Sequence, residues 1–127
     1  MNIFGIGTDI VSVHRIKNSL KNKNFIKRVY NQKEIFKCKK LSTSVNCFAK
    51  RFAAKEAFSK ALGTGISKGI NFNEIVILNK KSGRPYINIT GQTKRTLLKK
   101  FKGKKSKISL SVSDEKKYAV AFVTISI

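Results

Sequence analysis

In the first third of the chain, the spacing of apolar and polar residues is typical of a strand in one segment and of helices in the segments that follow. Residues 3–12 mix β-branched and small residues, which predicts a first strand. Gly5 and Gly7 within this strand indicate a bulge or the close approach of another backbone. Apolar residues at helical spacing then predict short helices at 14–21 and 24–38.

The longest helical pattern covers residues 44–62, which predicts the main helix of the protein. Ser44 is expected to be its N-cap, and Gly63 and Gly65 are expected to end it. The side chains expected to supply its buried surface are Phe48, Phe52, Phe58, Ala61 and Leu62.

The second half of the chain predicts two hairpins separated by a helix. The strands are expected at 73–78, 86–89, 108–112 and 118–127, and the helix at 91–101. The order of strand, helices, two strands, helix and two strands indicates an α+β fold, with a mostly antiparallel sheet packed against a long helix. No linker or internal repeat divides the 127 residues, so we expect one domain, 1–127.

The chain is strongly basic, with 28 Lys and Arg against six Asp and Glu and a net charge of +22. This predicts a polyanionic partner: nucleic acid, an acidic membrane face, a phosphorylated small molecule or an acidic protein. Charge alone does not choose among them, and the excess of Lys over Arg is also typical of AT-rich coding.

Cysteine content and hydropathy predict where the protein works. Cys38 and Cys47 are too few and too widely spaced for a zinc cluster, so we expect two reduced thiols. We expect no signal peptide, because the chain does not begin with a basic region followed by an apolar stretch, and no apolar run approaches the ~20 residues of a membrane span. We therefore expect a cytoplasmic protein without a membrane partner.

Two isolated carboxylates, Asp9 and Glu56, stand out because acids are so scarce in this chain. Together they could hold Mg²⁺, which takes one or two carboxylates and fills its other positions with water and phosphate oxygens. Small neighbours such as Ala53 and Ala57 leave room beside Glu56 for a ligand. The alternatives are a surface ion pair between Glu56 and Lys60, and a turn or capping role for Asp9.

Several neighbours of Glu56 could bind phosphates. Arg51, Lys55 and Lys60 are spaced to share one side of the helix, either as a solvated face or as phosphate ligands. The segment 63–65 (GTG) could be a simple helix end or a close approach to a phosphate or a pantetheine arm. His14 is the only histidine, and we interpret it as a surface residue.

Several motifs resemble one family, the holo-[acyl-carrier-protein] synthases, which are small bacterial 4′-phosphopantetheinyl transferases. The match begins with GIGTDIV at 5–11 and is strongest in KRFAAKEA at 50–57 and KALGTG at 60–65. It continues in GINF at 69–72, GRP at 83–85, SVSDE at 111–115 and YAVA at 118–121.

The resemblance implies an activity and a set of site residues. It implies transfer of 4′-phosphopantetheine from coenzyme A to a serine of apo-acyl carrier protein in fatty acid biosynthesis, releasing adenosine 3′,5′-bisphosphate. It implies that Mg²⁺ binds Asp9 and Glu56, and that Glu56 and Lys60 are catalytic. The implied coenzyme A contacts are Arg51, Lys60, Gly63, Thr64, Gly65 and Pro85. Arg15 and Arg28 are implied to grip the acidic carrier, and the family is typically a homotrimer with sites between subunits.

One departure from the family concerns the general base. Many members have a histidine where this chain reads SVSDE at 111–115, so Glu56, or a water that it orients, is the preferred proton acceptor. The main alternative function is a small basic nucleic-acid-binding domain, with Phe25, Tyr30 and Tyr86 stacking on bases. We favour the transferase and no specific nucleic acid, because that alternative does not explain Asp9 and Glu56. A purely structural protein is the third alternative.

Overall fold

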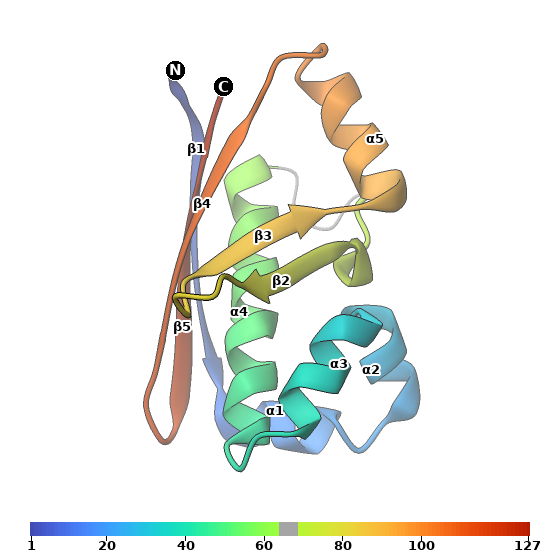
Figure 1. Cartoon of the computed structure of the whole chain (residues 1–127), viewed down its shortest axis with the longest axis vertical. Coiled ribbons are helices and arrows are strands. Elements are labelled where there is room, and N and C mark those ends of the chain that lie inside the picture. Colours follow the sequence, from blue (N-terminus) through green and yellow to red (C-terminus); the bar gives the residue numbers. More distant parts are fainter. Residues whose placement is uncertain (64–68) are drawn as a thin grey trace.

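The computed structural model describes residues 1–63 and 69–127 and shows an α+β fold built around one long helix (Figure 1). In chain order the elements are β1 (Ile3–Ser12), α1 (Val13–Ser19), α2 (Lys23–Val29), α3 (Gln32–Lys39), α4 (Ser44–Leu62), η1 (Phe72–Glu74), β2 (Ile75–Asn79), β3 (Pro85–Ile89), α5 (Gly91–Lys100), β4 (Lys107–Asp114) and β5 (Tyr118–Ser126). The strands form an antiparallel sheet in the order β1-β5-β4 and an antiparallel hairpin, β2-β3. The predicted fold class is confirmed.

Helix α4 lies directly on β1, and glycine makes this contact possible. A Cβ atom on either Gly5 or Gly7 would lie 1.9 Å from a main-chain carbonyl oxygen of α4, that of Ala61 or Ala57 respectively. The small residues on both elements therefore let the two backbones touch, which confirms the predicted close approach. This contact fixes how the side chains that follow Gly7 lie against α4.

The sheet has one buried and one exposed face, as its alternating sequence requires. In β5, Ala119, Ala121, Val123 and Ile125 are buried against α4, whereas Tyr118, Val120 and Phe122 between them are exposed. Asp9 pairs with Ala121 across the ladder, so it lies in the middle of β1 on the buried face. The alternative of a turn or capping role for Asp9 is therefore wrong.

The single helix predicted at 24–38 is two helices. The chain leaves helical geometry at Tyr30, with φ −113° and ψ 144°, and α3 begins behind an Asn31 N-cap. The Asn31 N–H donates to Glu34 Oε1 at 2.9 Å, and the Asn31 side chain accepts from the Lys33 N–H. This reciprocal cap stabilises a new helix start inside a continuous apolar pattern.

Two further expectations are wrong. The N-cap of α4 is Thr43, not Ser44, and it makes no side-chain cap hydrogen bond. Cys38 and Cys47 are not free thiols but form a disulfide between the end of α3 and the start of α4. The turn between these helices brings the two Cα atoms within 5.4 Å despite the separation of nine residues.

The N-terminus of α5 is capped by a residue from another element. Its own N-cap, Thr90, makes no side-chain cap hydrogen bond. The Glu74 carboxylate accepts from the N–H groups of Gln92 and Thr93 at 2.9 and 3.0 Å. Burial pushes the pKa of Glu74 up, but hydrogen bonds from Asn71, Thr93 and Gln92 outweigh it and hold the pKa at about 2. Within residues 1–63 and 69–127, no helix is both long and apolar enough to cross a bilayer.

Candidate active site

Asp9 and Glu56 line one hollow of about 310 Å³ between β1, α1 and α4. Asp9 comes from the buried face of the sheet, and Glu56 comes from the middle of the helix that rests on it. The close packing of Gly7 on Ala57 is what brings these two elements together. The structure thus unites the two carboxylates that the sequence selected.

Lys60 binds Asp9 rather than Glu56. Its Nζ donates to Asp9 Oδ1 at 3.2 Å and to the Thr8 carbonyl oxygen at 2.9 Å. Among the described residues Glu56 forms no ion pair. The alternative interpretation of Glu56 as the surface partner of Lys60 is therefore wrong.

The electrostatics of the hollow favour a cation. Burial raises the pKa of Glu56, the neighbouring charge of Asp9 raises it further, and Lys60 offsets part of this. Two carboxylates with only partial compensation offer the hard oxygen donors that Mg²⁺ prefers. The residues present therefore fit a magnesium ion.

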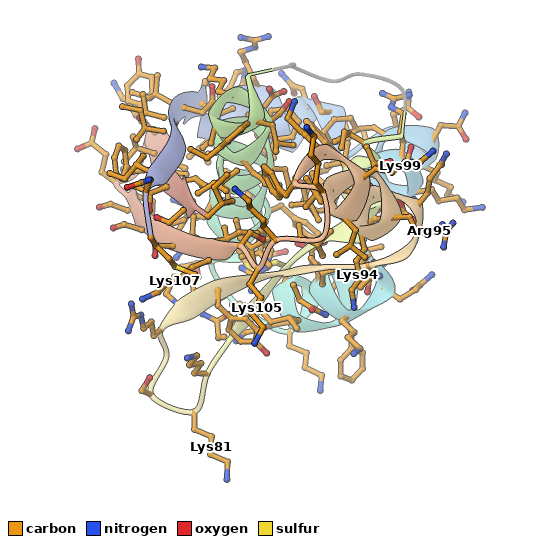
Figure 2. All side chains as sticks on the ribbon, turned by 90° about the horizontal axis from the view of Figure 1, so that it is seen from above. Lys81, Lys94, Arg95, Lys99, Lys105 and Lys107 are labelled. Atoms are coloured by element: carbon orange, nitrogen blue, oxygen red, sulfur yellow. A yellow bond between two sulfur atoms is a disulfide. The ribbon has the colours of Figure 1, made fainter. Side chains whose placement is uncertain are left out.

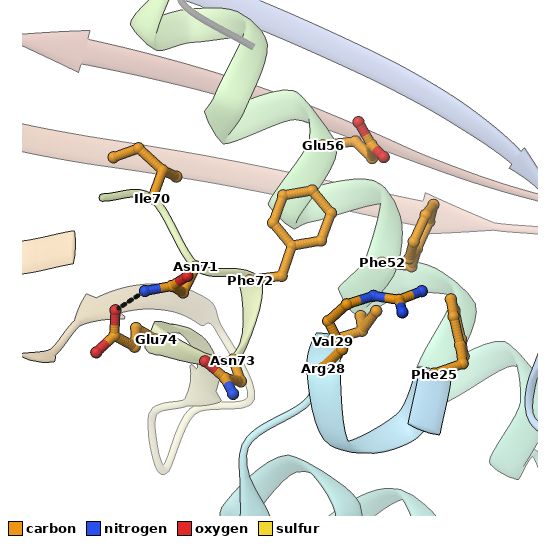
Figure 3. Close-up of a pocket in the computed structure, with 10 residues that line it drawn as sticks. All are labelled: Phe25, Arg28, Val29, Phe52, Glu56, Ile70, Asn71, Phe72, Asn73 and Glu74. Atoms are coloured by element: carbon orange, nitrogen blue, oxygen red, sulfur yellow. Dashed lines mark hydrogen bonds between the residues drawn. The ribbon is translucent and has the colours of Figure 1, made fainter. Parts of the chain in front are cut away.

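Glu56 also borders a larger hollow of about 540 Å³ between α2, α4 and η1 (Figure 3). The two hollows adjoin at three shared side chains, those of Phe25, Phe52 and Glu56, and together they are called the cleft below. Figure 3 shows Arg28 reaching from α2 toward Phe25 and Phe52. Exposed Arg15 lines the other hollow, so both predicted docking arginines lie at this cleft.

The predicted basic cluster around Glu56 is not formed. Arg51 is buried elsewhere, where its Nη2 donates to Asn79 Oδ1 at 2.9 Å, and it shares a separate hollow of about 40 Å³ with Pro85. Lys55 is fully buried in an ion pair with Glu34 at 2.8 Å. Of the three cations, only Lys60 lies beside the carboxylates.

Comparisons with known proteins agree with this geometry. A family model for the 4′-phosphopantetheinyl transferase superfamily matches residues 5–123. The chain belongs to this superfamily. A holo-[acyl-carrier-protein] synthase from Pelagibacter ubique is 50% identical over 98% of both chains, and one from Ehrlichia canis is 46% identical over 97% of this chain and 94% of its own.

Solved structures give the same result for this phosphopantetheinyl transferase. A holo-[acyl-carrier-protein] synthase from Neisseria meningitidis is 38% identical and matches with a TM-score of 0.87, covering 98% of this chain and 99% of the other. One from Bacillus anthracis, in complex with coenzyme A (3′,5′-ADP), is 35% identical with a TM-score of 0.81 and covers 98% and 97%. The resemblance in the motifs is confirmed.

The remaining candidates take varied positions in the transferase. Gly63 ends α4 in the left-handed conformation, with φ +79°, and a Cβ added there would meet no atom of the described residues within 4 Å. Thr64 and Gly65 lie outside the described residues. Asp114 does more than form a turn: it accepts from Asn46 Nδ2 at 2.8 Å and pairs with Lys50 at 3.6 Å, tying β4 to α4.

Sequence reasoning missed the aromatic wall of the cleft. Phe25, Phe52 and Phe72 line it, and the rings of Phe25 and Phe52 are 6.0 Å apart. The helical spacing of Phe25 and Phe52 could not separate them from core anchors, because a half-buried aromatic residue shows the same periodicity as a buried one.

Proposed function

We propose that this transferase moves 4′-phosphopantetheine from coenzyme A to a serine of apo-acyl carrier protein, releases adenosine 3′,5′-bisphosphate and supports fatty acid biosynthesis. The observation that carries the proposal is the shared hollow of Asp9 and Glu56. The coenzyme A complex of the Bacillus anthracis relative supports the choice of donor. Because the family match spans 5–123, we treat 1–127 as one transferase domain.

Asp9 and Glu56 would hold Mg²⁺. When bound there, the ion would supply positive charge for the pyrophosphate of coenzyme A and for the leaving group. The raised pKa of Glu56 supports this assignment, because a cation would relieve the unfavourable charge that burial and Asp9 impose.

The other site residues act on the phosphates and the attacking serine. The Lys60 ammonium lies beside Asp9 with its side chain 55% exposed, which leaves it able to contact a phosphate as well. Glu56, or a water that it orients, is our candidate for the proton acceptor, since its carboxylate lines the hollow that the attacking serine would enter. Gly63 and the adjoining Thr64 and Gly65 would contact coenzyme A.

The carrier would dock where Arg15 and Arg28 flank the cleft, with Phe25 and Phe52 between the two hollows. Acyl carrier proteins are acidic, so opposite charge would speed their encounter with a chain of net charge +22.

We also propose a homotrimer with sites between subunits. The outer face of the sheet supports association, because Ile6, Val120 and Phe122 are all exposed on it. The separation of the Arg51–Pro85 hollow from Asp9 and Glu56 supports a composite site. In such a site, Arg51 and Pro85 would approach coenzyme A held at the carboxylates of a neighbouring subunit.

The test is to incubate the protein with MgCl2, coenzyme A and apo-carrier and to measure the carrier's mass. We expect a phosphopantetheine adduct with the native chain and at least a hundredfold slower transfer with Asp9→Ala or Glu56→Ala, as for loss of an essential charge-stabilising group. The control Glu115→Ala, an exposed acid outside the cleft, should keep the native rate.

A second readout separates the metal site from the reaction. MgCl2 should raise the melting temperature of the native chain and of Glu115→Ala, but not of the two site variants. Near-native transfer by Asp9→Ala or Glu56→Ala would contradict the assignment of these residues as the metal site. A chain that binds nucleic acid with a steep salt dependence and yields no adduct would instead support the nucleic-acid-binding alternative.

A further inference from the structure

The segment formed by α5 and the residues after it carries the densest positive charge in the chain. Eight of the 14 residues from 94 to 107 are Lys or Arg, against 20 of the other 113. All eight are exposed, and within the described residues none of them is in an ion pair. Figure 2 labels five of them: Lys94, Arg95, Lys99, Lys105 and Lys107.

This clustering is not what coding bias predicts, because such a bias would scatter lysines evenly along the chain. Like charges without acidic neighbours repel one another and disfavour the compact state. A polyanionic partner would offset that repulsion. The proposed active site does not explain this segment, because none of these cations lines the Asp9–Glu56 cleft.

Apolar surface lies within the same cluster. A hollow of about 220 Å³ between β3, α5 and the start of β4 is lined by Ile87, Ile89, Leu97 and Phe101, with Lys94 and Lys104 also in its wall. Leu98 borders this hollow and is 52% exposed. On the helix Arg95 and Lys94 lie three and four residues before Leu98, so this exposed apolar side chain has cations beside it.

We propose that this α5 surface, comprising the eight cations of 94–107, Leu98 and the adjoining hollow, binds the face of an anionic phospholipid bilayer. Headgroup phosphates match the cations, and the acyl region beneath them accepts Leu98 and offers methylene groups to the hollow. Nucleic acid would also supply phosphates, but its backbone has no apolar segment to meet Leu98 and the aliphatic side chains of the hollow. The combination of aliphatic surface and cations therefore favours lipid.

The position of the α5 surface is compatible with the proposed function. Figure 1 shows α5 at one end of the long axis and α1 and α2, which carry Arg15 and Arg28, at the other. Binding to a bilayer through α5 leaves the cleft open to a carrier in solution. This replaces the expectation of no membrane partner, which rested on the lack of a span; binding at the surface requires none.

The test is co-sedimentation with phosphatidylglycerol vesicles and with phosphatidylcholine vesicles at low salt. Binding should require phosphatidylglycerol and weaken in 0.5 M NaCl. The triple variant Lys94→Gln, Lys99→Gln and Lys104→Gln should bind about a hundredfold more weakly, at about fivefold per charge. The matched control Lys81→Gln, Lys116→Gln and Lys117→Gln loses the same charge at exposed positions elsewhere and should stay within about threefold of native.

Leu98→Ser tests the apolar contribution and should weaken vesicle binding about fivefold. Its control is Leu41→Ser, a comparably exposed leucine between α3 and α4, which should bind as the native chain does. Both α5 variants should keep native transfer rates and a native KM for the carrier.

Four outcomes would overturn the proposal: no binding to phosphatidylglycerol, equal losses in the two triple variants, no effect of Leu98→Ser, or a raised KM for the carrier in the α5 triple variant. The last would assign the surface to the acidic carrier instead of lipid. If duplex DNA binds with the same loss in the triple variant and Leu98→Ser binds vesicles normally, the surface recognises polyanions in general.

Discussion

At the residue scale, Glu56 is the carboxylate of the cleft whose ionised form the fold destabilises. Burial and the charge of Asp9 both raise its pKa, so its ionised form is less stable in the folded chain than in the unfolded one. At a pH below the unfolded value of about 4.3, Glu56 is protonated in both states and this cost disappears. Once the pH has risen above the raised pKa of the folded state, Glu56 is ionised in both states, and the full loss in the free energy of unfolding is present.

Removing this charge should therefore stabilise the protein at neutral pH. In the presence of a chelator, Glu56→Gln should raise the free energy of unfolding at pH 7 by no more than about 1 kcal/mol, because the side chain is only half-buried and water screens it. At pH 4 the gain should be close to zero. Urea unfolding at both pH values measures it, and an equal gain at both would show that the charge is not its cause.

Arg15 is the residue whose role in docking can be tested most directly. Arg15→Glu should raise the KM for apo-carrier at least tenfold while changing the KM for coenzyme A little, since the substitution repels an acidic carrier. Steady-state kinetics with each substrate varied in turn measures the difference. The control Lys116→Glu makes the same charge change on the β4–β5 turn. Equal effects on both substrates would place Arg15 outside the docking surface.

At the element scale, one buried ion pair fastens the wall of the cleft to α4. Lys55 Nζ donates to Glu34 Oε1 at 2.8 Å, to the Phe72 carbonyl oxygen at 2.9 Å and to the Ile75 carbonyl oxygen. Glu34 Oε2 accepts from the Ile77 N–H at 3.2 Å. The pair thereby joins α3, α4, η1 and β2, and it holds Phe72 in the wall of the hollow that Glu56 also lines. Burial lowers the pKa of Lys55 to about 8, although Glu34 raises it.

Replacing one partner of this ion pair should lower the free energy of unfolding far more than replacing both partners. Lys55→Met leaves Glu34 charged and buried and should destabilise the protein by about 3–5 kcal/mol. The double variant Lys55→Met/Glu34→Gln should be more stable than the single one, because no unpaired charge remains. The control Lys60→Met removes an exposed ion pair and should cost less than about 1 kcal/mol. Urea unfolding compares them; equal stability of the single and double variants would contradict this account.

Local patterns predicted most elements of the fold. The bounds of α4, the antiparallel hairpins and the close packing at Gly5 and Gly7 all follow from periodicity and residue size nearby. The break at Tyr30 was missed, because the apolar spacing continues through it and only the Asn31 cap reveals it.

The site residues that could be predicted are those of a residue type that is rare in this chain. The positions of the others depend on contacts between residues far apart in the sequence. Asp9 and Glu56 could be selected because acids are rare in this chain. The burial of Lys55 depends on Glu34, which lies 21 residues away, so helical spacing could not reveal it. Arg51 is five positions before Glu56, about 140° around the helix, which turns it away from the cleft.

At the scale of the whole molecule, no element within residues 1–63 and 69–127 covers the outer face of the β1-β5-β4 sheet, where Ile6, Ile10 and Phe122 are exposed. Thr8 pairs with Phe122 and Ile6 with Thr124, so the exposed Ile6 and Phe122 lie diagonally adjacent on one face. Contiguous apolar surface on a sheet is typical of an interface, and a rotationally symmetric trimer would bury it three times. A composite site would then make activity depend on this distant face.

The double variant Ile6→Lys/Phe122→Lys should convert the proposed trimer into monomers and reduce transfer at least a hundredfold, although neither residue lines the Asp9–Glu56 cleft. Sedimentation velocity measures the mass, and the carrier adduct measures the activity. The control Leu41→Lys adds charge at an exposed leucine off the sheet and should stay trimeric and active. A monomeric variant with native turnover would show that each chain works alone. A native chain that is itself monomeric would contradict the proposed trimer. Because the substitutions leave Asp9 and Glu56 in place, a monomer that still gains stability from MgCl2 but transfers nothing would locate the missing contribution in the neighbouring subunit.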